Sequence, residues 1–441
     1  MVAFMLLGGM LLTGCTTENP GVNPGTSTPT GDDPTEAPTG GDPTEEPTEE
    51  PTEAPTEAPT PQGPTMTIGG VDISNFVIVY EAPADKSTLG NYWRDDFDGG
   101  KQTAKALAAM IKEKFGVDVA VVQDVGGRKS ANEILIGKTN RTESNAAKGL
   151  GFDDYYIGMK DGKLVVRGYS MGVTWHALDE FKALFEATPA NGTCAIPADF
   201  ERKGQYHLDN IAILGDSITY GALSTNYTQN GGLFGYAKTF ARMNWRDCRV
   251  TVYATPGICL RTDLNGFMTN SLWTQFTSRS KGDKFDVLMV MLGTNDGYTD
   301  AGPTTGWNGV WTAEDDASFL KTMDDLATAA IKLNPGLKTV FLSCPVYYRS
   351  GDPSSPYYHT SHYHVTPHTI ELQKQGVESM RAKGMDVHLF DMNLYTTEKT
   401  PATMYSDLLH PNDEGHFIMA QGVYAMYPLF KNGETNKYLI N

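Results

Sequence analysis

The chain has 441 residues, 40% of them hydrophobic, which is enough apolar material for two ordinary domains with cores of their own. The formal net charge of −18 is unevenly spread: residues 1–65 carry 11 acidic residues and no Lys or Arg, whereas the remainder carries 42 acidic against 35 basic residues. No basic stripe indicates nucleic-acid binding, and the acidic balance argues against docking on an anionic membrane surface.

The first 15 residues have the pattern of a targeting segment. Their apolar run, residues 2–12, is too short to span a bilayer as a helix. It ends in Leu12-Thr13-Gly14-Cys15, which resembles the cleavage site of a bacterial lipoprotein, although no basic residue precedes the run. We expect a lipid on Cys15 and a location on the extracellular face of a bacterial cell membrane. An ordinary secretory signal, the alternative, also leads outside the cell.

Residues 16–65 are a low-complexity segment of Pro, Thr and Glu. Such a composition lacks the apolar mass for a core and favours extended polyproline II conformations. At about 3.1 Å per residue, fifty residues reach at most about 150 Å. The segment is therefore predicted to be a disordered stalk.

Residues 66–205 are predicted to form a small, mixed α/β domain. Apolar runs predict strands, and the helical pattern of 103–115 stops at Gly116. Asp161-Gly162 is a strong hairpin turn signal between two further strands. The predicted strands are 76–80, 117–122, 133–137, 155–159 and 163–167, and the predicted helices are 103–115 and 173–185.

Three short stretches in this domain carry a resemblance. They are Glu133-Ile134-Leu135-Ile136-Gly137, Leu164-Val165-Val166-Arg167-Gly168 and Trp175-His176-Ala177. Together they resemble the accessory domain that precedes the catalytic module in alpha-glucuronidases. The resemblance implies a domain that accompanies an enzyme acting on polysaccharide.

Residues 206–441 alternate between apolar strands and helical segments. This alternation predicts a doubly wound α/β domain with a five-stranded parallel sheet. The predicted strands are 211–214, 250–253, 285–292, 338–343 and 387–390, and the predicted helices are 234–243, 264–277, 315–333 and 369–383.

Residues able to carry chemistry follow three of these strands. Ser217, Gly257 and Asn295 each come three or four residues after a strand, and Asp407 and His410 lie in the loop before the last helix. Ligands bind at the carboxyl ends of strands in such sheets, so all five are expected at one edge. A nucleophile, an imidazole, a carboxylate and oxyanion donors suit acyl transfer at an ester.

The same stretches resemble the SGNH, or GDSL-type, hydrolase family, which has a flavodoxin-like sheet. Gly215-Asp216-Ser217, Gly257, Gly293-Thr294-Asn295-Asp296 and Asp407-x-x-His410 match its four blocks in order. The resemblance implies that Ser217 is the nucleophile, His410 the general base and Asp407 its orienting carboxylate. It also implies an oxyanion hole formed by Ser217, Gly257 and Asn295. The neighbours of Gly257 depart from the family pattern.

Gly168-Tyr169-Ser170-Met171-Gly172 offers a rival nucleophile. It matches the G-x-S-x-G elbow of α/β-hydrolases, with Ser170 at its centre. The strands before it form a hairpin rather than a parallel unit, so we expect a tight turn into a helix.

Two segments rich in aromatic or imidazole groups leave alternatives open. His359, His362, His364 and His368 lie in a tyrosine-rich segment without a neighbouring acidic or cysteine ligand, which favours a substrate-facing or exposed loop over zinc binding. Residues 297–311 carry Tyr298, Trp307 and Trp311, which either stack on sugar rings or pack locally. Cys194, Cys248, Cys259 and Cys344 form no CxxC pair; a bridge between Cys248 and Cys259 and free buried thiols are both open.

These observations predict a surface-anchored serine esterase that needs no metal or cofactor. The expected substrate is acetyl or another short acyl group on a carbohydrate. A lipolytic esterase or thioesterase of the same family is the first alternative, and a non-catalytic surface glycan-binding protein is the second.

Overall fold

The computed structural model describes residues 63–126, 129–296, 311–345, 361–399, 402–407 and 409–440, with no side-chain description for residues 230, 361–367 and 402. All of them belong to one compact unit. The predicted signal segment and nearly all of the predicted stalk lie outside the described residues. No helix among the described residues is long and apolar enough to cross a membrane.

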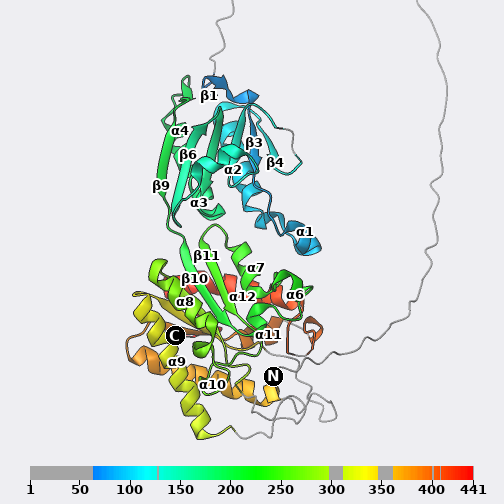
Figure 1. Cartoon of the computed structure of the whole chain (residues 1–441), viewed down its shortest axis with the longest axis vertical. Helices are drawn as coiled ribbons and strands as arrows, with labels where there is room; N and C mark the ends of the chain where they lie inside the picture. Colours follow the sequence, from blue (N-terminus) through cyan, green and yellow to red (C-terminus); the bar gives the residue numbers. More distant parts are fainter. Residues whose placement is uncertain are drawn as a thin grey trace, which may run out of the picture. The chain divides into compact units, whose positions relative to one another are not determined.

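The first module is built on a six-stranded sheet (Figure 1). Its strand order is β4-β3-β5-β7-β6-β9. The four strands from β4 to β7 pair in parallel, whereas β6 pairs antiparallel with both β7 and β9. The strands are β3 (Val77–Tyr80), β4 (Ala120–Gln123), β5 (Glu133–Ile136), β6 (Asp154–Lys160), β7 (Lys163–Gly168) and β9 (Glu201–Gln205).

The predicted hairpin is confirmed between β6 and β7. Asp161 and Gly162 have φ values of 49° and 80°, which suit the tight turn that matches strand twist. The long helix α2 (Gly99–Phe115) begins at Asp98, whose Oδ1 accepts a hydrogen bond from Lys101 N at 2.9 Å, and ends at Gly116 with φ 73°. The single helix predicted over 173–185 is wrong: α3 (Met171–His176) and α4 (Leu178–Ala187) replace it.

A smaller sheet beside this core was not predicted. It consists of β1 (Thr65–Ile68), β2 (Val71–Asp72) and β8 (Thr193–Ile196), in the order β2-β1-β8. Strand β2 has only two residues, and threonines interrupt or precede the few apolar residues of β1 and β8, so none of the three is a clear apolar run. Short helical turns complete the module: α1 (Lys86–Leu89) and the 3-10 turns Ile73–Asn75, Gly90–Tyr92, Asp95–Phe97 and Thr142–Ala147.

The second module has a sheet in the order β11-β10-β12-β13-β14-β15. Its strands β10 and β11 are labelled in Figure 1. The five predicted strands are all present and parallel: β10 (Asp209–Gly215), β11 (Cys248–Ala254), β12 (Val287–Met291), β13 (Lys338–Leu342) and β14 (Val387–Phe390). The prediction of five strands is nevertheless wrong, because β15 (Leu439–Ile440) adds a sixth, antiparallel to β14. Two residues give no strand signal in a sequence.

Helices cover both faces of this sheet, as a doubly wound fold requires. Buried side chains of α8, α9 and α10 form one core with the sheet, and those of α7, α11 and α12 form another. The helices are α5 (Ser217–Tyr220), α6 (Tyr227–Asn230), α7 (Tyr236–Met243), α8 (Ser271–Gly282), α9 (Ala313–Leu333), α10 (Ser361–Ala382), α11 (Met392–Lys399) and α12 (Asp413–Asn432), with 3-10 turns at Phe267–Thr269 and Ala402–Met404.

Helix α8 begins seven residues later than predicted. Residues before it fold back on themselves, with a bridge between Cys259 and Gly266. Phe267, within the predicted helix, is buried from a 3-10 turn instead, so its burial does not require an α-helix.

The linker between the modules makes contacts on both sides. His207 Nδ1 lies 3.1 Å from Asp153 of the first module, and its Nε2 lies 3.2 Å from Asp286 of the second. A second contact between the modules lies outside the linker. Trp245, between α7 and β11, donates a hydrogen bond from its side-chain Nε1 to the Asp96 carbonyl of the first module at 3.0 Å.

Candidate active site

The strand register brings three predicted site residues to one edge of the second sheet. Gly215, the last residue of β10, pairs with Ala254 of β11 and with Met291 of β12. Ser217, Gly257 and Asn295 follow these three positions by two, three and four residues. Because neighbouring parallel strands end at the same level, these residues gather beyond their carboxyl ends.

Ser217 is the first residue of α5 and is only 5% exposed. Asp216 begins this helix, and its Oδ1 accepts a hydrogen bond from Ile218 N at 2.9 Å. Burial raises the pKa of the Asp216 carboxyl. A Cβ at Gly215 would lie 2.0 Å from the Thr219 hydroxyl, so only glycine permits this tight passage from strand to helix.

His410 connects Ser217 to Asp407. Its Nε2 lies 2.8 Å from Ser217 Oγ, and its Nδ1 lies 2.8 Å from Asp407 Oδ2. The other oxygen of Asp407 accepts backbone hydrogen bonds from His410 N at 2.7 Å and from Leu409 N at 3.1 Å. Burial opposes ionisation of Asp407, but the hydrogen bonds from His410 prevail and hold its pKa below the usual range.

The loop that carries His410 is attached to the loop that follows Ser217. Thr225 N donates to Asp413 Oδ1 at 2.8 Å, and Ser406 Oγ donates to the Leu223 carbonyl at 3.3 Å. Leu223 has φ 61°, an unfavourable value for a branched side chain. These contacts hold two distant segments in a fixed relation, which keeps the imidazole beside the hydroxyl.

Asp296 is a supporting residue that the sequence did not single out. Its carboxylate accepts hydrogen bonds from Leu260 N at 2.8 Å and Arg261 N at 2.7 Å, and only 3% of the residue is exposed. Burial raises its pKa to about 6, although the two backbone donors favour the ionised form. Asp296 thus fastens the segment after Gly257 to the strand end that carries Asn295. Its place next to Asn295 was the only available signal.

Asn295 and Gly257 both lie at this edge. The Asn295 side chain donates from Nδ2 to the Ile258 carbonyl at 2.9 Å, which leaves the second amide hydrogen of that nitrogen. Gly257 is exposed and has φ 74°, while a Cβ there would meet nothing within 4 Å. Backbone conformation rather than packing therefore favours glycine at this position.

Ser170, the rival nucleophile, begins helix α3. Its Oγ accepts a hydrogen bond from Val173 N at 3.4 Å. The nearest histidine in sequence, His176, is bonded through Nε2 to the Arg246 carbonyl and is stacked on Tyr206. A Cβ at Gly168 would lie 2.7 Å from Thr174 N, and one at Gly172 would lie 2.4 Å from the Trp245 carbonyl oxygen. Close packing therefore requires both glycines, in agreement with the predicted tight turn into a helix.

The histidine-rich and aromatic segments are described only in part. His359, Tyr298 and Trp307 lie outside the described residues, as do the side chains of His362 and His364. His368 pairs with Asp316 at 2.7 Å. Trp311 packs against Phe319 and the Arg261 guanidinium, which agrees with local packing for this one residue.

The cysteines and one cluster of possible metal ligands show no sign of a second reactive site among the described residues. Cys194, Cys248, Cys259 and Cys344 are buried thiols outside any disulfide, so the bridge between Cys248 and Cys259 does not form. One ring nitrogen of His207 and one carboxylate oxygen each of Asp209 and Asp286 lie within 4.8 Å of one another, a spacing that metal ligands also have. However, Asp209 pairs with Lys431 at 2.5 Å and with the Tyr427 hydroxyl, and His207 pairs with Asp153.

Comparison with known proteins assigns a class to the second module. Residues 213–418 match the model of the GDSL-like Lipase/Acylhydrolase family. The matched segment runs from β10 through the His410 loop into α12. The chain therefore carries a GDSL-like lipase/acylhydrolase domain, as the resemblance predicted. No curated protein matches the chain.

Several solved structures are also similar to this chain. A family two carbohydrate esterase from Clostridium thermocellum, in complex with cellohexaose, has 17% identity and a TM-score of 0.36, covering 53% of this chain and 68% of its own. A putative SGNH hydrolase from Slackia heliotrinireducens has 17% identity and a TM-score of 0.36, with 50% and 100% covered. The acetyl xylan esterase Est2A from Butyrivibrio proteoclasticus has 16% identity and a TM-score of 0.34, with 53% and 68% covered.

Proposed function

We propose that the GDSL-like domain is a serine esterase that cleaves acetyl or similarly short acyl esters through an acyl-enzyme. The observation that supports this most is the continuous contact from Ser217 Oγ through His410 to Asp407, with both heavy-atom distances at 2.8 Å. Nucleophile, base and orienting group within hydrogen-bond reach are the requirement for activating a serine hydroxyl.

In the first half-reaction Ser217 Oγ attacks the ester carbonyl carbon while His410 Nε2 accepts its proton. The Ser217 and Gly257 backbone N–H groups and the remaining Asn295 amide hydrogen are the proposed donors to the tetrahedral oxyanion. When the intermediate collapses, His410 returns the proton to the departing alcohol. Asp407 keeps the Nδ1 proton in place and stabilises the imidazolium.

In the second half-reaction water replaces the alcohol. His410 takes a proton from the water, which attacks the acyl carbon, and then gives the proton back to Ser217 Oγ. The products are a short carboxylic acid and free enzyme. All of these proton transfers pass through one nitrogen, His410 Nε2.

The proposed substrate is an acylated carbohydrate outside the cell. Three features of the sequence support this: the lipoprotein-like segment at Cys15, the extended stalk and the resemblance of residues 66–205 to an accessory domain of polysaccharide-degrading enzymes. We also propose that lipidated Cys15 is the membrane attachment. A Cys15→Ser variant that still fractionates with membranes and still incorporates labelled palmitate would contradict that attachment.

Acetate release from acetylated xylan, pectin, mannan and peptidoglycan tests the function. We expect at least one polymer to release acetate with the wild type and none with Ser217→Ala. Hydrolysis of long-chain acyl esters or thioesters alone would favour the lipolytic or thioesterase alternative. A folded wild type that hydrolyses no ester but binds glycan would favour the non-catalytic alternative.

A further inference from the structure

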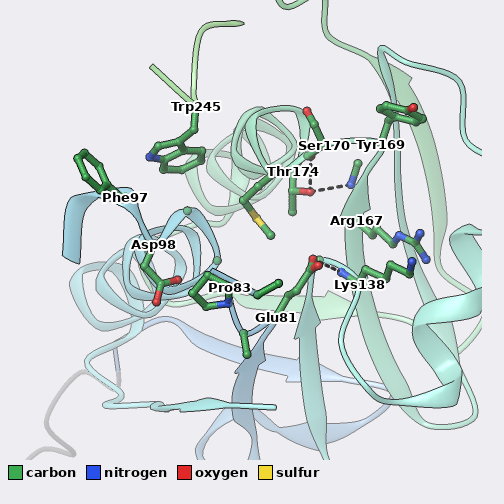
Figure 2. A pocket seen from close by; sticks show the side chains of 17 residues that line it. Glu81, Pro83, Phe97, Asp98, Lys138, Arg167, Tyr169, Ser170, Thr174 and Trp245 are labelled. Carbon is green, nitrogen blue, oxygen red and sulfur yellow. Dashed lines mark hydrogen bonds between the residues drawn. The ribbon is translucent and has the colours of Figure 1, made fainter. Parts of the chain in front are cut away.

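The first module contains a cavity of about 390 Å³, a size typical of small-ligand sites (Figure 2). Glu81, Gly137 and Tyr169 line it, and each directly follows the carboxyl end of a strand of the parallel part of the sheet: β3, β5 and β7. The start of helix α2 supplies another wall. The cavity therefore occupies the position where parallel sheets bind ligands.

The strand order makes this position more specific. The chain passes from β3 through α2 to β4 on one side, and then crosses to β5 on the other side of β3. The helix before β4 and the connection after β5 consequently diverge beyond the end of β3. A crevice opens at such a switch point, and open α/β sheets bind ligands there.

Acceptors and donors of opposite charge line the cavity. Asp98 is fully buried, and its Oδ2 has no hydrogen-bond partner among the described residues, with the Lys86 ammonium 3.9 Å away. Glu81 is half-buried, and one of its oxygens accepts a hydrogen bond from Lys138 N at 2.7 Å. Burial raises the pKa of both carboxyls. A ligand that donates a hydrogen bond to Asp98 Oδ2 would therefore satisfy an acceptor that is costly to bury without a partner.

The two sides of the cavity differ in chemistry. Figure 2 shows Phe97, Asp98 and Trp245 on one side and Lys138 and Arg167 on the other, with Glu81 between them. The lining residues include two carboxylates, Glu81 and Asp98, and two cations, Lys138 and Arg167, so the formal charges of the lining cancel. A ligand that suits it is neutral, carries both hydroxyl donors and acceptors, and has an apolar face for an aromatic ring.

The walls are closely packed rather than loosely formed. A Cβ at Gly99 would lie 2.7 Å from the Met171 side chain and 2.9 Å from the Trp245 ring. A Cβ at Gly137 would lie 2.6 Å from the Met171 side chain and 2.8 Å from Glu81 Oε2. Glycine at both positions lets the strand end and the helix start approach the same side chain, which gives the cavity a defined shape.

We propose that this cavity binds a neutral sugar unit of a glycan. The inference does not depend on the proposed ester hydrolysis, because none of the cavity residues belongs to the Ser217 site. Trp245 precedes β11 at the amino end of the second sheet, whereas Ser217 follows its carboxyl edge. Seven strand residues at about 3.3 Å each put the two sites roughly 20 Å apart.

Sugar binding to the full chain carrying Ser217→Ala tests the proposal. The probes are unacetylated xylose, glucose, galactose, xylobiose and cellobiose, measured by saturation-transfer NMR and titration calorimetry. Asp98→Asn keeps an oxygen to begin helix α2 but turns the unsatisfied acceptor into a donor. Ala84→Trp, at an exposed position on the cavity rim, obstructs the cavity without changing a buried group. Asp118→Asn is the matched control, an exposed acid-to-amide change elsewhere in the module.

We expect at least one sugar to bind, with affinity at least tenfold weaker in Asp98→Asn and Ala84→Trp and unchanged in Asp118→Asn. The proposal is overturned if no probe binds the folded protein, or if binding survives both cavity variants. It is also overturned if a phosphonate that reacts with wild-type Ser217 abolishes sugar binding, since the sugar would then occupy the esterase site. Loss of esterase activity in Ser217→Ala leaves this test unaffected.

Discussion

Replacing Asp407 by Asn should change the tautomer of His410 while leaving the backbone hydrogen bonds of its loop intact. Asp407 Oδ1 accepts two backbone hydrogen bonds, and Oδ2 faces His410 Nδ1. An Asn side chain satisfies both backbone donors only with its oxygen in the Oδ1 position. Its NH2 group then faces His410 and donates to Nδ1, so the imidazole proton moves to Nε2. Nε2 consequently presents a hydrogen to Ser217 Oγ and can no longer accept one.

The expected loss in kcat is about 10,000-fold, because the same change in a Ser-His-Asp triad stabilises the wrong tautomer of the histidine. This corresponds to about 5 kcal/mol in activation free energy. The loop should remain stable, since no backbone donor loses its partner, and the melting temperature should change by only a few degrees.

The assay is hydrolysis of 4-nitrophenyl acetate together with thermal unfolding. Asp386→Asn is the matched control: Asp386 also pairs with a histidine, His388, at 2.7 Å, but it precedes β14 at the opposite edge of the sheet. We expect the control to keep wild-type kcat. An Asp407→Asn enzyme with more than a tenth of wild-type kcat would refute the tautomer argument.

Three further predictions concern His416, Gly257 and the rival serine, Ser170. His416 is fully buried, and burial lowers its pKa to about 3. Below about pH 6.5 the unfolded chain binds a proton at this histidine that the folded protein cannot, so the free energy of unfolding falls as pH drops toward 3. His416→Gln should remove up to about 5 kcal/mol of this acid destabilisation, measured by urea unfolding at several pH values, and an unchanged pH dependence would contradict the prediction. Gly257→Ala should cost about 1–2 kcal/mol because of its φ of 74°. Relaxation of that φ turns the proposed donor N–H away from the oxyanion, so kcat should fall by up to about 100-fold, the cost of one lost donor. Gly282→Ala, with open space and an ordinary φ, should change neither stability nor kcat. Ser170→Ala should keep kcat and lose about 1 kcal/mol of stability as a helix start, measured by urea unfolding; loss of activity there, with activity retained in Ser217→Ala, would reverse the assignment of the nucleophile.

The sequence predicted those parts of the fold whose signals are local. Each parallel strand of the second module is rich in apolar residues, and the Asp161-Gly162 turn determines its hairpin without help from the rest of the chain. The meeting of strand ends predicted one edge for Ser217, Gly257 and Asn295, whereas Asp407 and His410 lie in the loop before α12 and their roles came from the family resemblance. By contrast, β1, with two threonines among its four residues, and the two-residue β15 carry no such signal and depend on pairing with distant segments.

Other features could not be predicted because they depend on long-range packing. Nothing in the spacing of residues 257–270 distinguishes a buried loop from a helix, since both bury apolar residues at similar intervals. The role of Asp296 requires knowing that its carboxylate reaches backbone groups 35 and 36 residues earlier in the chain. The cavity beside Glu81 and Asp98 likewise appears only when three strand ends and a helix start are brought together.

Strand β15 has a consequence for how this protein behaves at high concentration. It covers only Leu389 and Phe390 of β14, and it is held there by the Asn436 side chain, which accepts from Tyr438 N and Leu439 N at 2.8 Å. Exposed strand edges recruit further strands and lead to aggregation. By contrast, the edge strand β9 of the first module has the sequence Glu-Arg-Lys-Gly-Gln, whose charges discourage such pairing. Loosening of residues 436–440 would therefore expose the less protected edge, and self-association through β14 is the expected first route to precipitation.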